Sequence, residues 1–139
     1  LHLNFLFFRK KGMDRNVVGW FEIPTLDLNR AQKFYEEVLG FKLERQTVGT
    51  SVMAFFPWKE DAAGSPGSLI QEDEFYHPSA EGVVIYFTSP SGDAANELAR
   101  VDGAGGKLLR DKTEIADGHG FYGLALDTEG NRIAIHSLK

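Results

Sequence analysis

The chain of 139 residues contains no cysteine. This absence excludes a disulfide framework, a thiolate zinc site and a cysteine nucleophile. Basic residues are also in the minority, with 15 Lys and Arg against 20 Asp and Glu and a net charge of −5. Because phosphate binding requires clustered basic side chains, we expect no nucleic-acid partner. The composition fits a reducing compartment, and we predict a cytoplasmic location.

Long hydrophobic runs are equally scarce. The apolar stretch at residues 1–8 is too short to span a bilayer, so we expect no membrane partner. Three basic residues follow this stretch, whereas in a secretory signal the positive charges come first. We therefore predict that residues 1–14 form an N-terminal extension of the domain, in which residues 1–12 lie upstream of a natural start at Met13; a functional leader is the alternative.

Aromatic residues are plentiful, with 11 Phe, four Tyr and two Trp. Each buried aromatic side chain removes roughly 150–250 Å² from water, so a chain of this length can build a core without covalent staples. The rest of the chain, residues 15–139, is accordingly predicted to form a single domain.

One helix is indicated by the spacing of apolar residues between positions 28 and 39, which recur every three or four residues. Asp27 is a suitable N-cap, and Gly40 suits the left-handed conformation that follows a helix. Before this helix, the β-branched and aromatic stretch 17–24 predicts a strand that ends at Pro24.

The order of predicted elements repeats. Further strands are expected at 41–48, 51–56 and 68–71. The second half has a strand at 82–88, a helix with its apolar face on residues 94–101, and strands at 107–110, 121–126 and 132–136. This pattern predicts an α+β fold with two βαβββ modules in tandem, residues 15–79 and 80–139. Neither half is large enough to bury its sheet alone, so we expect a cupped mixed sheet, a half-barrel with the helices outside.

Two sets of residues resemble a known family. The first module carries Trp20-Phe21-Glu22-Ile23-Pro24 and Asp27-Leu28-Asn29-Arg30-Ala31, and the second carries Asp127-Thr128-Glu129-Gly130-Asn131. These stretches resemble the vicinal-oxygen-chelate superfamily of glyoxalases, bleomycin resistance proteins and extradiol dioxygenases. The subgroup that they resemble is the predicted lactoylglutathione-lyase-related proteins. The resemblance implies paired βαβββ modules around a concave cavity, with one divalent metal held by four side chains.

The chain departs from that family at the metal positions. The positions that usually carry ligands fall on Trp20, Val84 and Ala134, and the fourth falls near Gln71. Indole, valine and alanine offer no lone pair to a hard cation. We therefore predict that the standard metal centre is absent. A displaced divalent-metal site formed by Glu22, His136 and Gln71 remains the alternative.

Other residues on the strands that carry these metal positions are candidates for chemistry. Side chains two apart in a strand share a face, so Glu22, Tyr86 and His136 point where the missing ligands would point. A carboxylate, a phenol and an imidazole can orient a ligand or transfer a proton. We name these three as candidate catalytic residues. The structural alternatives are an ion-paired Glu22, a packing role for Tyr86 and a hydrogen-bonded His136.

The candidate substrate-binding residues are Trp20, Gln71 and His119. Trp20 is predicted to form the cavity wall, and His119 to lie in a loop over the cavity. Two functions follow: a lyase or isomerase with Glu22 as base, or a protein that binds and sequesters a small molecule without turnover, as bleomycin resistance proteins do. The resemblance also implies a homodimer.

Overall fold

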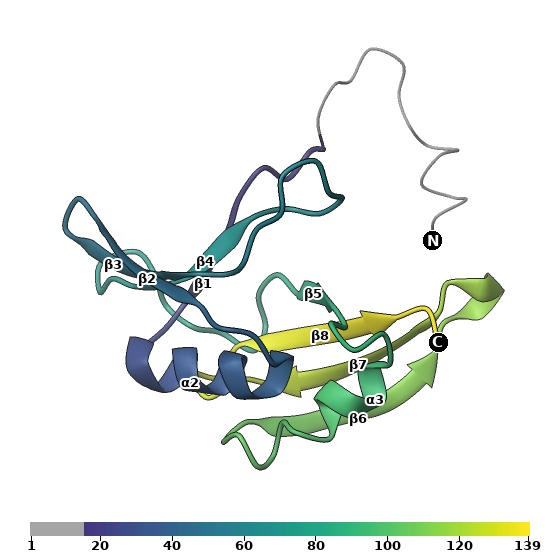
Figure 1. Cartoon of the computed structure of the whole chain (residues 1–139). Helices are drawn as coiled ribbons and strands as arrows, with labels where there is room; N and C mark the ends of the chain where they lie inside the picture. Colours follow the sequence, from purple (N-terminus) through teal and green to yellow (C-terminus); the bar gives the residue numbers. More distant parts are fainter. Residues whose placement is uncertain (1–15) are drawn as a thin grey trace.

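The computed structural model describes residues 16–139, so the predicted extension and its start at Met13 lie outside the described residues. The described chain contains two four-stranded sheets, each with a helix (Figure 1). The first sheet belongs to residues before position 72 and the second to residues after position 84. This arrangement confirms the predicted α+β class and the repeat of two βαβββ units.

The first sheet, sheet A, has the strand order β1-β4-β3-β2. Strand β1 (Phe21–Pro24) pairs in parallel with β4 (Gly67–Gln71). Strands β2 (Glu44–Val48) and β3 (Ser51–Phe55) form an antiparallel hairpin, and β3 pairs with β4. Helix α2 (Leu28–Leu39) connects β1 to the hairpin and packs on β3 and β4.

The second sheet, sheet B, repeats this topology with the order β5-β8-β7-β6. Its elements are β5 (Ile85–Thr88), α3 (Ala94–Leu98), β6 (Lys107–Glu114), the single turn η1 (Ala116–Gly118), β7 (Phe121–Leu126) and β8 (Arg132–Ser137). Strand β5 is parallel to β8, as β1 is to β4. Helix α3 packs on β6, β7 and β8.

Several predicted boundaries differ from the structure because strand ends depend on a partner strand; β2, for example, begins at Glu44 instead of residue 41. The strand predicted at 17–24 begins only at Phe21, which pairs with the first residue of β4. For the same reason β5 begins at Ile85 instead of residue 82. In contrast, β6 runs on to Glu114, because it keeps pairing with β7 up to Phe121.

Helix α2 has the boundaries that its apolar spacing predicts. The Asp27 side chain accepts a hydrogen bond from the backbone N–H of Arg30 at 3.1 Å, which caps the first turn. Gly40 ends the helix with φ of 80°, a conformation that side chains with a Cβ rarely adopt. The buried face contains the residues that recur at helical spacing, Leu28, Ala31, Phe34, Tyr35, Val38 and Leu39.

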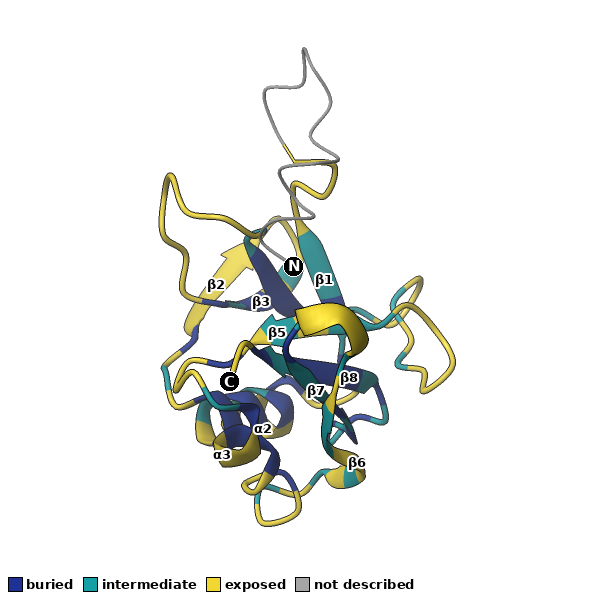
Figure 2. Ribbon diagram, turned by 90° about the vertical axis from the view of Figure 1, so that its right-hand side faces the viewer, coloured by how far each residue is buried: buried dark blue, intermediate teal, exposed yellow. Residues whose placement is uncertain are grey.

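One hydrophobic core serves both modules. It contains the buried face of α2 together with Ala94 and Leu98 of α3 and apolar side chains from both sheets. Phe34 packs against Gly106 of the second module so closely that a Cβ there would lie 2.6 Å from the ring. Figure 2 shows that the buried residues form the centre of the molecule, while β2 is exposed along its length. The two modules are therefore one packing unit.

A buried polar network also joins the modules. We call it the inter-module network; its residues are Arg30, Tyr35, Asp127, Glu129 and Asn131. The Tyr35 hydroxyl donates to Asp127 at 2.6 Å, and the backbone N–H groups of Glu129 and Asn131 donate to the same carboxylate at 2.8 and 2.9 Å. Burial, followed by the nearby negative charge of Asp127, raises the pKa of Tyr35 well above its usual value.

Glu129 forms the second half of this network at the start of α2. Its carboxylate accepts hydrogen bonds from the backbone N–H groups of Leu26 and Asp27, both at 2.8 Å, and from Arg30 at 2.8 and 3.0 Å. A carboxylate from the second module thus satisfies backbone donors of the first. The Asp-x-x-Gly-Asn sequence that resembles the superfamily has a structural role in this chain.

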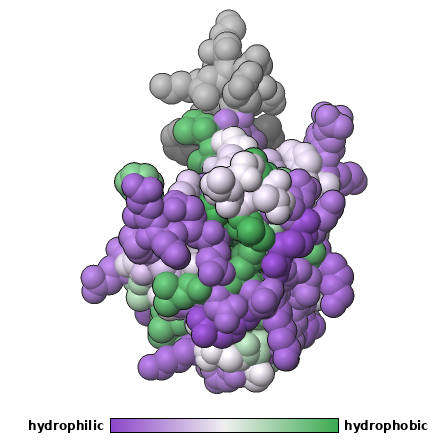
Figure 3. Space-filling model, turned by 90° about the vertical axis from the view of Figure 1, so that its left-hand side faces the viewer, coloured by the Kyte–Doolittle hydropathy of each residue, from purple (hydrophilic) through white to green (hydrophobic). Residues whose placement is uncertain are grey.

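No helix among residues 16–139 is both long and apolar enough to cross a membrane. Seen from the side of the β2–β3 hairpin, the surface is mostly hydrophilic and is crossed by one band of hydrophobic side chains (Figure 3).

Candidate functional site

The two sheets each have one face that the helices do not cover, and we call these the helix-free faces. In sheet A, Ile23 and Leu69 belong to the shared core. Glu22 precedes Ile23 in β1, and Ser68 precedes Leu69 in β4. Because the side chains of a strand alternate between its two faces, Glu22 and Ser68 point to the face opposite the core. The register aligns Glu22, Ser68, Phe55 and Glu44 in one row across that face.

Two aromatic rings cover the middle of this row. Trp20 and Phe55 meet edge to face, with ring centroids 5.2 Å apart. Trp20 lies directly before β1, and Phe55 ends β3; these two strands flank β4, the strand that carries Ser68. The Ser68 side chain is fully buried, and its hydroxyl has no hydrogen-bond partner in the structure. Trp20 keeps 41% of its surface exposed, which leaves room for contact with a ligand.

Glu22 lies beside this ring pair and has its own hydrogen-bond partner. The hydroxyl of Tyr76, in the linker after β4, donates to the Glu22 carboxylate. This bond, together with the negative charges of Glu22 and Glu72, raises the pKa of Tyr76. The Tyr76 hydroxyl therefore lies close to the carboxylate that the sequence singles out.

Sheet B presents a second aromatic pair on its helix-free face. Tyr86 of β5 stacks on Tyr122 of β7, with centroids 6.3 Å apart and 28° between the ring planes. Tyr86 is 55% exposed. The Arg110 guanidinium lies 6.0 Å from the centre of the Tyr122 ring, a weak cation–π contact. Tyr86 therefore packs, as the structural alternative expects, and still offers an exposed ring.

His136 is fixed by the loop before β7. Its Nε2 lies 2.7 Å from the backbone oxygen of His119, so Nε2 donates to that carbonyl. The bond places His119 next to His136 at the edge of sheet B. Glu22, Tyr86 and His136 thus each have a separate neighbour, and within residues 16–139 no hydrogen bond, ion pair or ring contact joins any two of them.

Gln71 lies elsewhere. It shares the helix-facing side of β4 with Leu69, and its side-chain oxygen accepts from the backbone N–H of Leu28 at 2.8 Å. The structure therefore places this side chain at the start of α2, on the opposite side of sheet A from Glu22. Its observed contact stabilises the helix.

The residues at the superfamily's metal positions do not fit a metal ion. Trp20, Val84 and Ala134 offer no ligand atom, and the amide oxygen of Gln71 is bonded to the helix start. In the described part of the chain, no three His, Asp or Glu side chains lie close enough together to hold a metal.

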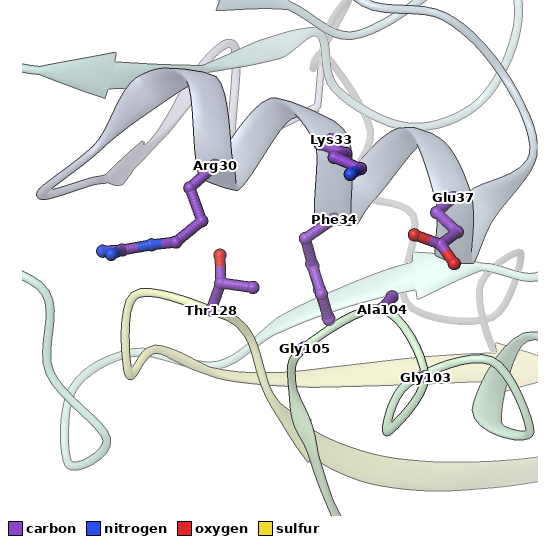
Figure 4. A pocket seen from close by; sticks show the side chains of 8 residues that line it. All are labelled: Arg30, Lys33, Phe34, Glu37, Gly103, Ala104, Gly105 and Thr128. Atoms are coloured by element: carbon purple, nitrogen blue, oxygen red, sulfur yellow. The ribbon is translucent and has the colours of Figure 1, made fainter.

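Two surface cavities lie outside the helix-free faces. The first, of about 370 Å³, is formed by α2 and the loop after α3, with Phe34 pointing toward Gly105 (Figure 4). Its Arg30 and Thr128 side chains both bond Glu129 of the inter-module network. The second, of about 500 Å³, lies beside Arg45 and Gln71. The polar groups named in these cavities already stabilise the fold.

Several residues of the helix-free faces were not among the sequence-predicted site residues: Phe55, Ser68, Tyr76, Arg110 and Tyr122. Four of them lie in strands. The alternation of side chains predicts which face of the sheet each one is on, but its neighbours on the adjacent strand depend on the register between the strands. Tyr76 lies in an irregular linker, for which the sequence has no periodic signal.

Comparison with known proteins supports the fold. Residues 18–54 match a model described as bleomycin resistance protein-like N-terminal. No curated protein is similar enough in sequence to count as a relative. Among solved structures, a glyoxalase/bleomycin resistance protein from Albidiferax ferrireducens has a TM-score of 0.65 at 16% identity, covering 86% of this chain and 98% of that one.

Two further structures are similar. A glyoxalase-related enzyme from Fulvimarina pelagi has a TM-score of 0.63 at 19% identity, with 90% and 88% of the two chains covered. Glyoxalase I from Zea mays has a TM-score of 0.61 at 21% identity, covering 86% of this chain but 45% of the maize chain. This chain thus spans about half the length of the maize enzyme.

Proposed function

The chain has the fold of the vicinal-oxygen-chelate superfamily, and on this premise we propose that it binds a small organic molecule on the helix-free face of sheet A without converting it. The observation that carries this proposal is the exposed Trp20 ring, which contacts Phe55 in the row of residues that also contains Glu22. Partly exposed aromatic rings with a few placed polar groups are typical of ligand sites. A proton-transfer centre, in contrast, needs its acid and base near one reacting atom, whereas Glu22 and His136 lie on different sheets.

Ligand titrations followed by NMR test this function. The protein has two tryptophans, so two indole N–H signals report on two places. Trp20 lies on the helix-free face, and Trp58 lies in the loop after β3 with 50% of its surface exposed. We expect small aromatic ligands to shift the Trp20 signal and leave the Trp58 signal in place. The ligand should be recovered unchanged after prolonged incubation. Equal shifts at both tryptophans would indicate unspecific contact and contradict the proposal.

A second candidate function, a lyase or isomerase, is favoured by the Tyr76–Glu22 hydrogen bond. A carboxylate held by a phenol is placed to take a proton from a carbon next to a carbonyl, with Tyr86 and His136 orienting the substrate. On this alternative, Glu22→Gln abolishes turnover of the hemithioacetal of methylglyoxal and glutathione while the circular dichroism spectrum stays unchanged. Full activity in Glu22→Gln would contradict the enzyme alternative.

The homodimer and the cytoplasmic location also remain proposals. They rest on the resemblance to the superfamily and on the cysteine-free composition, respectively.

A further inference from the structure

The strands of sheet A carry only negative charge on their helix-free face. One row across this face runs from Glu22 of β1 through Ser68 and Phe55 to Glu44 of β2. The other strand positions of the face hold uncharged residues: Pro24, Gln46, Val48, Ser51, Met53 and Ile70. Arg45, the one basic residue in these four strands, points to the opposite face, where it bonds side chains of α2. We therefore expect a charged ligand on this face to be a cation.

Neither carboxylate of this row is neutralised by a cation of the described chain. Glu22 and Glu44 form no ion pair within residues 16–139. The bond that Glu22 does accept comes from the hydroxyl of Tyr76, which is a neutral donor. A carboxylate has two oxygens with about four acceptor sites between them. Glu22 thus keeps both acceptor capacity and an unneutralised charge for a ligand.

The hydroxyl of Ser68 is an independent sign of a ligand on this face. The side chain is fully buried, and its Oγ has no hydrogen-bond partner among the described residues. A buried hydroxyl without a partner destabilises a folded protein, and such groups are rare. Neighbouring strands of a sheet lie about 4.8 Å apart, so Ser68 lies next to both Glu22 and Phe55 in the row. A hydrogen-bond donor placed beside Glu22 is therefore within reach of this oxygen.

Trp20 adds an aromatic surface that is not fixed by strand pairing. Its ring is partly exposed and contacts Phe55, whose neighbour in the row is Ser68. Strand β1 begins only at Phe21, so a shift of Trp20 breaks no strand hydrogen bond. We expect a ligand to enter where Trp20 meets Phe55, since separating these two rings opens a path to the buried hydroxyl. The faces of indole rings also attract cations.

From these features we infer the class of the ligand: an aromatic molecule that carries a protonated primary amine on a short side chain. The aromatic ring lies against Trp20, and the ammonium group donates hydrogen bonds to the Glu22 carboxylate and to Ser68 Oγ. A primary ammonium has three N–H donors, which is enough for both acceptors. Charge-assisted hydrogen bonds and a cation beside an aromatic ring both favour this class over neutral molecules. This inference rests on the proposed binding function.

Four probes with the same ring system test the inference: 2-naphthylmethylamine, its quaternary N-trimethyl analogue, 2-naphthylmethanol and 2-naphthoate. Their dissociation constants are measured at neutral pH by NMR titration of the full chain, with the Trp20 indole signal as reporter. We expect the amine to bind about tenfold more tightly than the neutral alcohol, since a hydrogen bond to a charged group is worth about one power of ten or more. The quaternary analogue keeps the charge but has no N–H, so it should bind more weakly than the amine. The naphthoate should bind most weakly of the four.

Glu22→Gln and its matched control Glu44→Gln locate the amine. Both remove one negative charge from the same face, but Glu44 lies three strands away, at a distance of about 14 Å. We expect Glu22→Gln to weaken the amine about tenfold, to the level of the alcohol, and to leave the alcohol unchanged. Glu44→Gln should leave both nearly unchanged, because salt screens an exposed charge at that distance. Equal losses in the two variants would indicate a general attraction of cations and overturn the inference.

Two further positions test the ring and the hydroxyl. Trp20→Leu should weaken the amine and the alcohol, measured on the signals of the probes because the variant lacks the Trp20 reporter. Its matched control Trp58→Leu should weaken neither. Ser68→Ala should raise the unfolding temperature of the free protein, because it removes the unpaired hydroxyl, and should weaken the amine but not the quaternary analogue. Unchanged binding of the amine to Ser68→Ala would contradict the hydrogen bond to Ser68.

The outcomes separate the ligand class from the binding function. If the alcohol or the naphthoate binds as tightly as the amine, the ligand class is wrong but the binding function stands. The same conclusion follows if other small aromatic molecules shift the Trp20 signal while none of the four probes does. If no small molecule of any charge shifts that signal, the binding function itself fails.

Discussion

Asp127→Ala is expected to cost the protein about 3–5 kcal/mol of unfolding free energy, because it leaves several buried donors without an acceptor. Asp127 is 4% exposed and accepts from the Tyr35 hydroxyl, two backbone N–H groups and the Asn131 amide. A domain of this kind has only about 5–15 kcal/mol of stability in total. Urea unfolding followed by circular dichroism gives the loss directly, and thermal unfolding should show a midpoint lower by roughly 10 °C.

Tyr35→Phe is the matched control for this variant. It removes the hydroxyl but leaves the backbone N–H groups of Glu129 and Asn131 bonded to Asp127, so we expect a loss of only about 1 kcal/mol. Equal losses in the two variants would show that the backbone contacts of Asp127 contribute nothing. In that case the turn between β7 and β8 would not depend on this carboxylate.

Glu129→Gln is expected to cost about 2–3 kcal/mol at neutral pH, because a carboxylate that accepts several hydrogen bonds is replaced by a group that also carries donors. The main loss should come from the backbone N–H groups of Leu26 and Asp27. The Arg30 side chain is half exposed, so its ion pair with Glu129 is screened by water. Arg30→Gln should therefore cost less stability than Glu129→Gln.

The Glu129 effect should depend on pH. Burial tends to raise the pKa of Glu129, but hydrogen bonds from Arg30, Asp27, Thr128 and Leu26 outweigh it and hold the pKa below the usual 4.5. A lowered folded-state pKa means that the carboxylate stabilises the fold above pH 4.5 and that this contribution is lost as pH falls through the folded value. The stability difference between wild type and Glu129→Gln should thus be constant near neutrality and shrink in acid. A difference that does not change down to the acid transition would contradict the lowered pKa.

Much of the fold follows from local sequence patterns. The apolar spacing of α2 and its cap at Asp27 predict both ends of that helix, because the signal repeats over three turns. Strand ends are less predictable, since they depend on pairing with distant residues. Phe21 starts β1 because Gly67, 46 positions later, starts β4. No local feature of residues 17–20 indicates this limit.

The site is less predictable than the fold for the same reason. Alternation predicts that Glu22 and Trp20 share a face, and in the structure Trp20 contacts Phe55, which lies in the row of Glu22. The neighbours of Glu22 depend on the β1–β4 and β3–β4 registers, which bring Ser68 and Phe55 beside it. The position of Gln71 is the converse case: its residue type suggested a ligand contact, but its strand parity places it at the start of α2.

The core that both modules share bears on how the domain comes apart. With α2 packed against side chains of both halves, neither half retains a complete interior after separation. The unfolding reaction should consequently be all-or-none. The most slowly exchanging backbone amides of both sheets should then report the same free energy of opening in native-state hydrogen exchange. On this expectation, the two βαβββ motifs form one cooperative folding unit. A core substitution in either module should therefore lower the stability of both.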